Sequence, residues 1–102
     1  MEYLRGMGKR MEYLFENKEA IKEIAYRNKA LSIAVFGSVA RGEDEPSSDY
    51  DFLVTTSPES SLFDLGRMLI ELQTFLGEEV DLVDRGGLKP RDSHILKDAV
   101  LL

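Results

Sequence analysis

A short segment near the middle of the chain, residues 49–54, restricts the fold more than any other feature. Its two sets of alternate residues differ in kind: Tyr50, Phe52 and Val54 form one set, and Asp49, Asp51 and Leu53 form the other. Successive side chains of a strand point to opposite faces. The pattern therefore predicts a strand with one face in a core and two carboxylates on the other face, within a sheet that helices cover.

The rest of the chain supplies the partners of this strand. A helical pattern runs from Gly8 to Asn28. Apolar runs at Leu31–Phe36 and Val80–Val83 predict two further strands. Leucines at helical spacing predict a helix over 62–76, with a serine before it and Gly77 as its stop: Leu62, Leu65, Leu69, Leu72 and Leu76. With a last short helix in 93–101, the order predicts an α/β (α+β) fold, a small mixed sheet of about three strands flanked by helices.

Length and composition limit the organisation of the protein. The 102 residues predict one domain over 1–102, and 43% hydrophobic with 31% charged residues is typical of a globular chain. The chain has no cysteine, which excludes disulfides and thiolate metal sites. Neither a membrane-spanning apolar run nor a hydrophobic signal core is present in the sequence. We therefore expect a cytoplasmic protein with no membrane partner.

The charge is distributed unevenly along the chain. Residues 43–84 hold twelve Asp and Glu but only one basic residue, Arg67, whereas the net charge of the whole chain is −6. This acidic middle argues against binding of nucleic acid through a broad basic surface. It suits divalent cations, although on charge alone a solvated acidic face explains it equally well.

Three features predict one chemical site. Gly37-Ser38 follows a predicted buried strand, where a glycine permits a sharp turn and a serine offers donors to a phosphate. Asp49 and Asp51 lie on one strand face with Cα atoms about 6.6 Å apart, a spacing at which carboxylates can share Mg²⁺. Asp81, within an apolar strand, would add a third carboxylate, as a metal ligand or as a general base.

These residues also carry a resemblance to a known family. Gly37-Ser38, ten intervening residues and then Asp49-Tyr50-Asp51 match the signature of the DNA polymerase β-like nucleotidyltransferase superfamily. The local sequence of residues 36–42 and 48–51 resembles that of the smallest branch of this superfamily, the minimal nucleotidyltransferases (MNT proteins). These act as antitoxins in HEPN/MNT toxin–antitoxin pairs. The resemblance runs from about Ile21 to the C-terminus, and the motif shows no departure from the pattern.

The resemblance implies roles for individual residues. Asp49, Asp51 and Asp81 correspond to the catalytic carboxylates that hold Mg²⁺ in the family. Gly37 and Ser38 correspond to positions that bind the nucleotide triphosphate, and Arg41 corresponds to an arginine that contacts phosphate. The implied fold is the nucleotidyltransferase fold, and the implied reaction is Mg-dependent transfer of AMP from ATP to a tyrosine of a HEPN toxin (AMPylation).

Other functions stay open on the sequence alone. The chain could neutralise a toxin by binding without turnover, although three converging acids have no use in a purely binding scaffold. It could also transfer a nucleotide to a small molecule, although no substrate domain accompanies the catalytic core. Nucleotide preference and assembly into a homo-oligomer are not decided by these residues.

Overall fold

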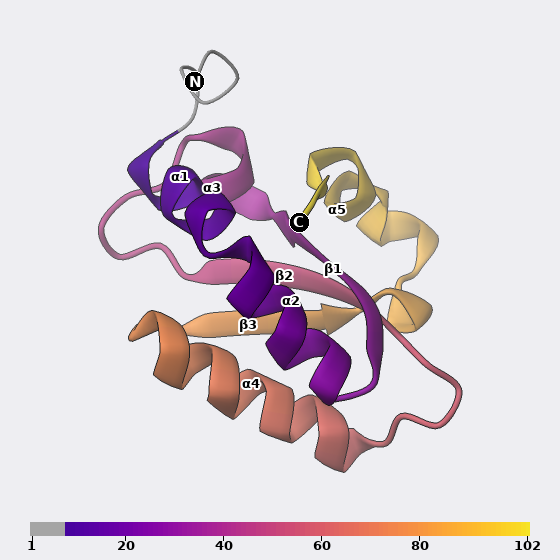
Figure 1. Ribbon diagram of the computed structural model, residues 1–102. Helices are drawn as coiled ribbons and strands as arrows, with labels where there is room; N and C mark the ends of the chain where they lie inside the picture. Colours follow the sequence, from indigo (N-terminus) through magenta and orange to yellow (C-terminus); the bar gives the residue numbers. More distant parts are fainter. Residues whose placement is uncertain (1–7) are drawn as a thin grey trace.

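The computed structural model describes residues 8–102, in which helices cover both faces of a mixed sheet (Figure 1). The sheet has four strands in the order β3-β2-β1-β4: β1 (Ala30–Phe36), β2 (Tyr50–Thr56), β3 (Val80–Asp84) and β4 (Val100–Leu101). The prediction of a small mixed sheet flanked by helices is confirmed, with one strand more than expected. Residues 1–7, which the sequence assigns to the same domain, lie outside the described part.

The strands pair in both directions. β1 is antiparallel to β2 and to β4, whereas β2 and β3 are parallel. A parallel pair needs a long crossover connection, and α4 (Leu62–Leu76) provides it between β2 and β3. The predicted short helix over 93–101 is α5 (Ser93–Asp98), and the chain then returns to the sheet as β4.

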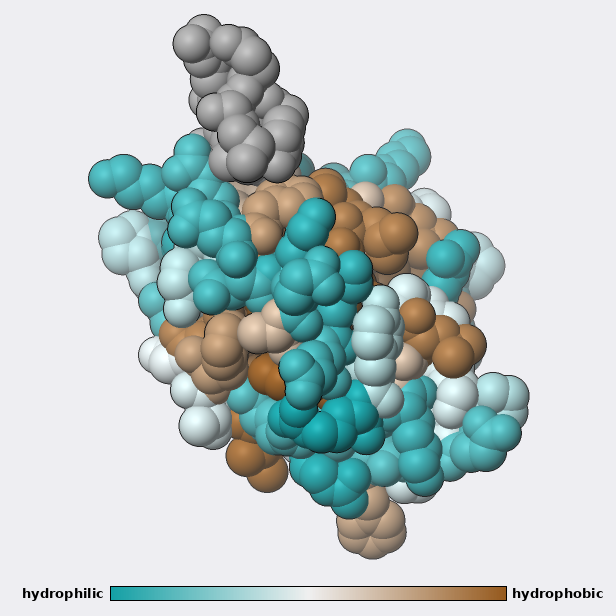
Figure 2. Space-filling view, viewed as in Figure 1, coloured by the Kyte–Doolittle hydropathy of each residue, from teal (hydrophilic) through white to brown (hydrophobic). Residues whose placement is uncertain are grey.

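One face of the sheet packs on the main hydrophobic core. Tyr50, Phe52 and Val54 are buried there, as the alternation in β2 predicted. Three helices cover this face, α1 (Lys9–Glu16), α2 (Lys18–Arg27) and α4, and they lie in front of the sheet in Figure 1. From this side the surface is mostly polar, with brown apolar patches between the polar side chains (Figure 2).

The helix predicted over 8–28 is two helices, which corrects the sequence interpretation. The backbone of Asn17 leaves the helical path with φ −108° and ψ 15°. Its side-chain Nδ2 donates to the Tyr13 carbonyl at 2.9 Å and so satisfies an acceptor at the end of α1. The same carbonyl also accepts the backbone N–H of Asn17 at 3.1 Å, so the asparagine side chain adds a second donor where α1 ends.

The long helix α4 has the predicted bounds and ends, and four leucines of the predicted stripe pack on the core: Leu72 and Leu76 are buried, and Leu65 and Leu69 are partly buried. Ser61 and Asp64 form a capping box at the start, and Gly77 ends the helix with φ +68°. Leu62, the first leucine of the predicted stripe, is 84% exposed. The buried residues of α4 are Asp64, Met68, Leu72 and Leu76.

The second face of the sheet is only partly covered. Ala34, Phe36 and Leu53 form a smaller core cluster there, and residues of α5 and of the segment before it pack against the cluster. Two short 3₁₀ helices, Arg85–Gly87 and Pro90–Asp92, connect β3 to α5. This is also the face to which the alternation of β2 directs Asp51.

Within residues 8–102, no helix combines the length and the apolar character that crossing a membrane requires.

Candidate active site

The three predicted carboxylates come together at one end of the sheet. Asp49 directly precedes β2, Asp51 is the second residue of β2, and Asp81 is the second residue of β3. Asp51 and Asp81 are direct partners in the parallel ladder, so they stand side by side on strands about 4.8 Å apart. Asp49 and Asp81 are exposed to solvent, whereas Asp51 is half-buried.

Gly37 lies against the middle carboxylate. It directly follows Phe36, the last residue of β1 and the partner of Asp51 in the ladder. Its φ is +74°, and a Cβ built on it would overlap an oxygen of the Asp51 carboxylate and lie 3.1 Å from Cγ. Only glycine permits both this backbone conformation and this close approach.

Gly37 also begins the short helix α3 (Gly37–Arg41). The sequence predicted a sharp turn at Gly37-Ser38, and in the structure this turn leads directly into α3. Ser38 is half-buried in the first turn of α3, and its contact with a phosphate stays a prediction.

The charges around Asp51 disfavour its ionised form. Partial burial raises the pKa of Asp51, and the nearby carboxylates of Asp81 and Asp49 raise it further. Arg41 and Arg10 act in the opposite direction but do not cancel these effects. A cation bound between the carboxylates would relieve the repulsion, so the electrostatics fit a cation site.

The donor set fits a hard divalent cation such as Mg²⁺, which takes oxygen ligands. Asp49, Asp51 and Asp81 offer only carboxylate oxygens, and all three lie at the same end of neighbouring strands. Across residues 8–102, however, no three acidic or histidine side chains are already drawn together closely enough to hold an ion. Binding would therefore require these side chains to move toward one another.

Arg41 lies at the end of α3 and is engaged in ion pairs. Its Nη1 donates to Asp98 Oδ2 at 2.6 Å, and its Nε lies 3.5 Å from Glu43 Oε1. The contact with Asp98 ties α3 to α5. The predicted phosphate contact of Arg41 stays a prediction, and it would require the guanidinium to leave or share these partners.

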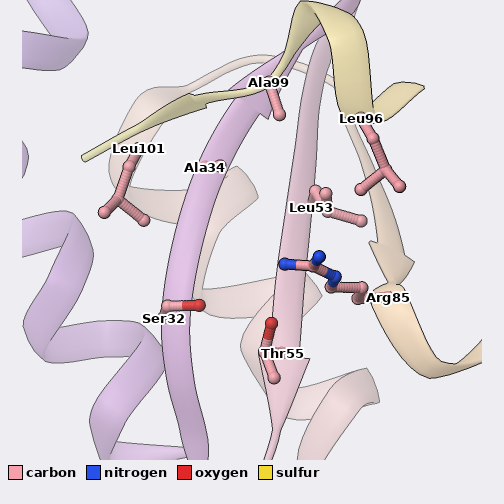
Figure 3. A pocket seen from close by; sticks show the side chains of 8 residues that line it. All are labelled: Ser32, Ala34, Leu53, Thr55, Arg85, Leu96, Ala99 and Leu101. Carbon is pink, nitrogen blue, oxygen red and sulfur yellow. The ribbon is translucent and has the colours of Figure 1, made fainter. Parts of the chain in front are cut away.

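A pocket lies on the partly covered sheet face, the face to which Asp51 points, but none of the three carboxylates lines it. It has a volume of about 330 Å³, and its floor is formed by Ser32, Ala34, Leu53 and Thr55. Leu53 and Thr55 follow Asp51 on the same face of β2. Figure 3 shows Ser32 and Thr55 on neighbouring strands and the Arg85 side chain extending over the sheet near Leu53. The pocket therefore shares a sheet face with Asp51 but is not part of the carboxylate cluster.

One residue near the site was not anticipated from the sequence. The guanidinium carbon of Arg10, in α1, lies 4.3 Å from the centre of the Tyr50 ring. Tyr50 is the residue between Asp49 and Asp51 in the chain. Arg10 also donates to Glu78 Oε2 at 2.7 Å. In the sequence Arg10 is one basic residue of a polar helix face, and its partners are 34 or more positions away, so no local signal identifies it.

Comparisons with known proteins identify the family of the chain. Residues 17–102 match the family described as the nucleotidyltransferase domain. A protein of Methanocaldococcus jannaschii, named as a candidate protein adenylyltransferase, is 37% identical over 86 residues, which cover 84% of this chain and 88% of the relative. A second protein of that organism with the same kind of name is 36% identical over 77 residues, or 76% of each chain.

Solved structures show the same fold. A candidate minimal nucleotidyltransferase superposes with a TM-score of 0.81 at 39% identity, covering 90% of this chain and 95% of that one. A toxin–antitoxin complex with AMP-PNP gives a TM-score of 0.71 at 23% identity, over 83% of this chain and 71% of the other. A Shewanella oneidensis complex of an MNT antitoxin with a tri-AMPylated HEPN toxin gives 0.63 at 20% identity, over 83% and 67%. These last two likenesses concern the fold alone.

Proposed function

Because the chain belongs to the nucleotidyltransferase domain family and is a nucleotidyltransferase of the minimal type, we propose that it transfers AMP from ATP to a hydroxyl group of a partner protein. The partner that we propose is a HEPN-type toxin, and the acceptor is a tyrosine of that toxin. The chain would then act as its antitoxin. The observation that carries this proposal is the position of Asp51, between Gly37 on one side and Asp81 on the other.

We also propose a direction for the reaction, which the positions of these residues support. In phosphoryl and nucleotidyl transfer the attacking and leaving oxygens lie roughly in line through the phosphorus. In our proposal Gly37 and Ser38 hold the β- and γ-phosphates next to β1. The α-phosphate then lies over Asp51, and the acceptor hydroxyl approaches from the β3 side, where Asp81 stands.

The reaction balances without a covalent intermediate on the protein. The acceptor oxygen bonds to the α-phosphorus, the bond from that phosphorus to the bridging oxygen breaks, and pyrophosphate leaves. Asp81, exposed and adjacent to Asp51, receives the hydroxyl proton. Asp49 and Asp51, with Asp81 beside them, would hold Mg²⁺, which supplies neutralisation of the negative charge on the phosphates.

The choice of acceptor has support from two sources. The relatives that match most of this chain carry names of protein adenylyltransferases. One neighbour in fold is an MNT antitoxin whose HEPN partner carries AMP groups. In our proposal the pocket of about 330 Å³ on the same sheet face as Asp51 takes part of the partner protein or of the nucleoside.

The experiment uses ATP carrying its label on either the α- or the γ-phosphate. The protein is incubated with Mg²⁺ and a purified HEPN-type partner, and the labelled residue is identified by mass spectrometry. We expect label from α-labelled ATP only, on a tyrosine of the partner, and none with the double variant Asp49→Asn/Asp51→Asn. Asp84→Asn, also at β3 but outside the proposed triad, is the matched control that keeps activity.

Three outcomes would contradict the proposal. Label from γ-labelled ATP would indicate a kinase. Label that persists in the double variant would remove the carboxylates from the mechanism. Absence of label, while the partner is still neutralised by the double variant, would leave a binding protein without turnover.

A further inference from the structure

We infer that Arg10 is a positioning residue for the carboxylate site, which it assembles by binding two loops at once. The inference rests on the proposed function only in taking Asp49, Asp51 and Asp81 as the cation ligands. Arg10 lies in α1, before the residues 17–102 that match the family. Arg10 would therefore support the site from a segment that the family match does not include.

Arg10 contacts three separate parts of the chain. Its Nη1 donates to the Glu45 carbonyl at 3.3 Å and lies 3.6 Å from Asp44 Oδ2, both in the segment between α3 and β2. Its Nη2 donates to Glu78 Oε2 at 2.7 Å, in the segment between α4 and β3. Its guanidinium lies over the ring of Tyr50 at the start of β2. The Arg10 side chain is only 16% exposed and that of Asp44 14%, whereas the Glu78 side chain is 45% exposed.

These contacts fix the two strand starts that carry the carboxylates. Tyr50 lies between Asp49 and Asp51 in the chain, and its N–H donates to the Glu79 carbonyl at 3.1 Å. Glu79 lies two residues before Asp81. The planar guanidinium thus holds the start of β2 and the start of β3 together from the face opposite to the carboxylates. A guanidinium can do this because its donors form a rigid fork, which a lysine lacks.

Positioning matters here because the carboxylates must approach one another to bind an ion. In the described residues they are adjacent but not gathered into a ready cation site. A strand start that moves more freely makes that convergence less favourable. Residues that orient metal ligands from behind typically contribute factors of 10 to 100 in metal affinity.

A positioning role and a purely electrostatic role predict opposite results for cation binding. Arg10 is a positive charge close to the proposed cation site, since it acts on Asp51 through space. Its removal would therefore strengthen cation binding if charge alone mattered. Removal of a positioning group weakens binding instead.

The experiment measures the dissociation constant of Mn²⁺, by electron paramagnetic resonance, for the full chain without nucleotide or partner. The variants are Arg10→Gln and Arg10→Lys, with Lys18→Gln as the control for loss of a positive charge. Lys18 starts α2, and its side chain makes no ion pair with any residue of 8–102. Circular dichroism first confirms that each variant is folded at the assay temperature.

We expect Mn²⁺ affinity to fall about tenfold for Arg10→Gln and to fall also for Arg10→Lys, which keeps the charge but not the fork. Lys18→Gln should stay at the wild-type value. In the transfer assay, the Arg10 variants should show a raised KM for the metal–nucleotide complex with a smaller change in kcat. Should Arg10→Gln fail to fold, Arg10→Lys carries the test.

Unchanged affinity for folded Arg10→Lys, or unchanged or tighter binding for folded Arg10→Gln, would overturn the inference. Failure of the cation-ligand assignment on which it rests is recognised separately, because then Asp49→Asn/Asp51→Asn would bind Mn²⁺ as the wild type does. Failure of the proposed transfer reaction is recognised by the labelling experiment and leaves the Mn²⁺ result unaffected.

Discussion

At the scale of single residues, the site depends on how closely the backbone of Gly37 approaches the Asp51 carboxylate. Both the positive φ and the absent Cβ are needed for this contact. The same backbone conformation occurs at Gly77, where a Cβ would meet no atom within 4 Å. The two glycines therefore form a matched pair. A side chain would strain the backbone at both positions, but only at Gly37 would it also collide with a carboxylate.

We predict that Gly37→Ala reduces nucleotidyl transfer strongly and that Gly77→Ala does not. Each variant places alanine at positive φ, which destabilises the fold by about 1–2 kcal/mol. Only Gly37→Ala also displaces Asp51. Urea unfolding and the transfer assay on the same samples check this. Equal activity of the two variants would remove the close approach from the mechanism.

A second residue-scale prediction concerns Asp51 and pH. Its pKa in the folded state is raised, so ionisation opposes folding. The wild type should therefore lose stability, relative to Asp51→Asn, as the pH rises from the ordinary Asp range through the raised pKa. At pH 7 without divalent cation, Asp51→Asn should have the higher Tm.

The pKa of Asp64 is shifted in the opposite direction, so its effect on stability has the opposite dependence on pH. Backbone and side-chain hydrogen bonds from Ser61 lower its pKa, so its ionised form supports the fold, and this support is lost as the pH falls through the lowered pKa. Asp64→Asn should lower the Tm at pH 7.

The Tm of both variants is measured against the wild type. For Asp51→Asn, a Tm below that of the wild type at pH 7 would contradict the electrostatic description of the site.

At the scale of elements, a buried polar network joins α2 to α4 far from the carboxylates. The fully buried Asn28 donates to the Ile24 carbonyl at 2.9 Å and to Glu71 Oε1 at 2.8 Å, and it accepts from Arg67. Asn28→Ala leaves these groups without their partner and should cost about 1–3 kcal/mol in the free energy of unfolding. Asn17→Ala, which removes one exposed hydrogen bond, should cost less.

Chemical denaturation measures both costs, and transfer activity of folded Asn28→Ala should match that of the wild type. Loss of activity at unchanged foldedness would mean that α2 and α4 communicate with the site.

The elements whose signals are local were predictable from the sequence, and those that depend on distant partners were not. The helix α4 carries its own periodicity, capping residues and terminal glycine, so its bounds follow from the sequence. The strand β4 has two residues and exists because Val100 and Leu101 pair with β1. The exposure of Leu62 depends on how α4 is rotated against the sheet, which the leucine spacing alone does not determine.

The site shows the same division. Asp49, Asp51 and the Gly37-Ser38 pair follow from a spaced motif, and the structure brings them together with Asp81. Arg10 was missed because its role depends on segments that meet it only in the folded chain.

At the scale of the whole molecule, the acidic residues are concentrated in one part of the chain. Residues 43–84 contain twelve acidic residues, among them all three site carboxylates. A cation that binds the folded state stabilises it by mass action. Millimolar Mg²⁺ should therefore raise the Tm of the wild type and leave that of Asp49→Asn/Asp51→Asn unchanged in differential scanning fluorimetry. An equal rise in both would indicate nonspecific screening of the acidic surface.

The most direct test of the central claim is the intact mass of a HEPN-type partner purified after co-expression with this chain. With the wild type we predict a partner that carries AMP on a tyrosine and a culture that grows. With Asp49→Asn/Asp51→Asn, folded and present at the same level, we predict an unmodified partner and arrested growth. Growth with an unmodified partner in both cultures would contradict the account, because the carboxylate site would then have no part in neutralising the toxin.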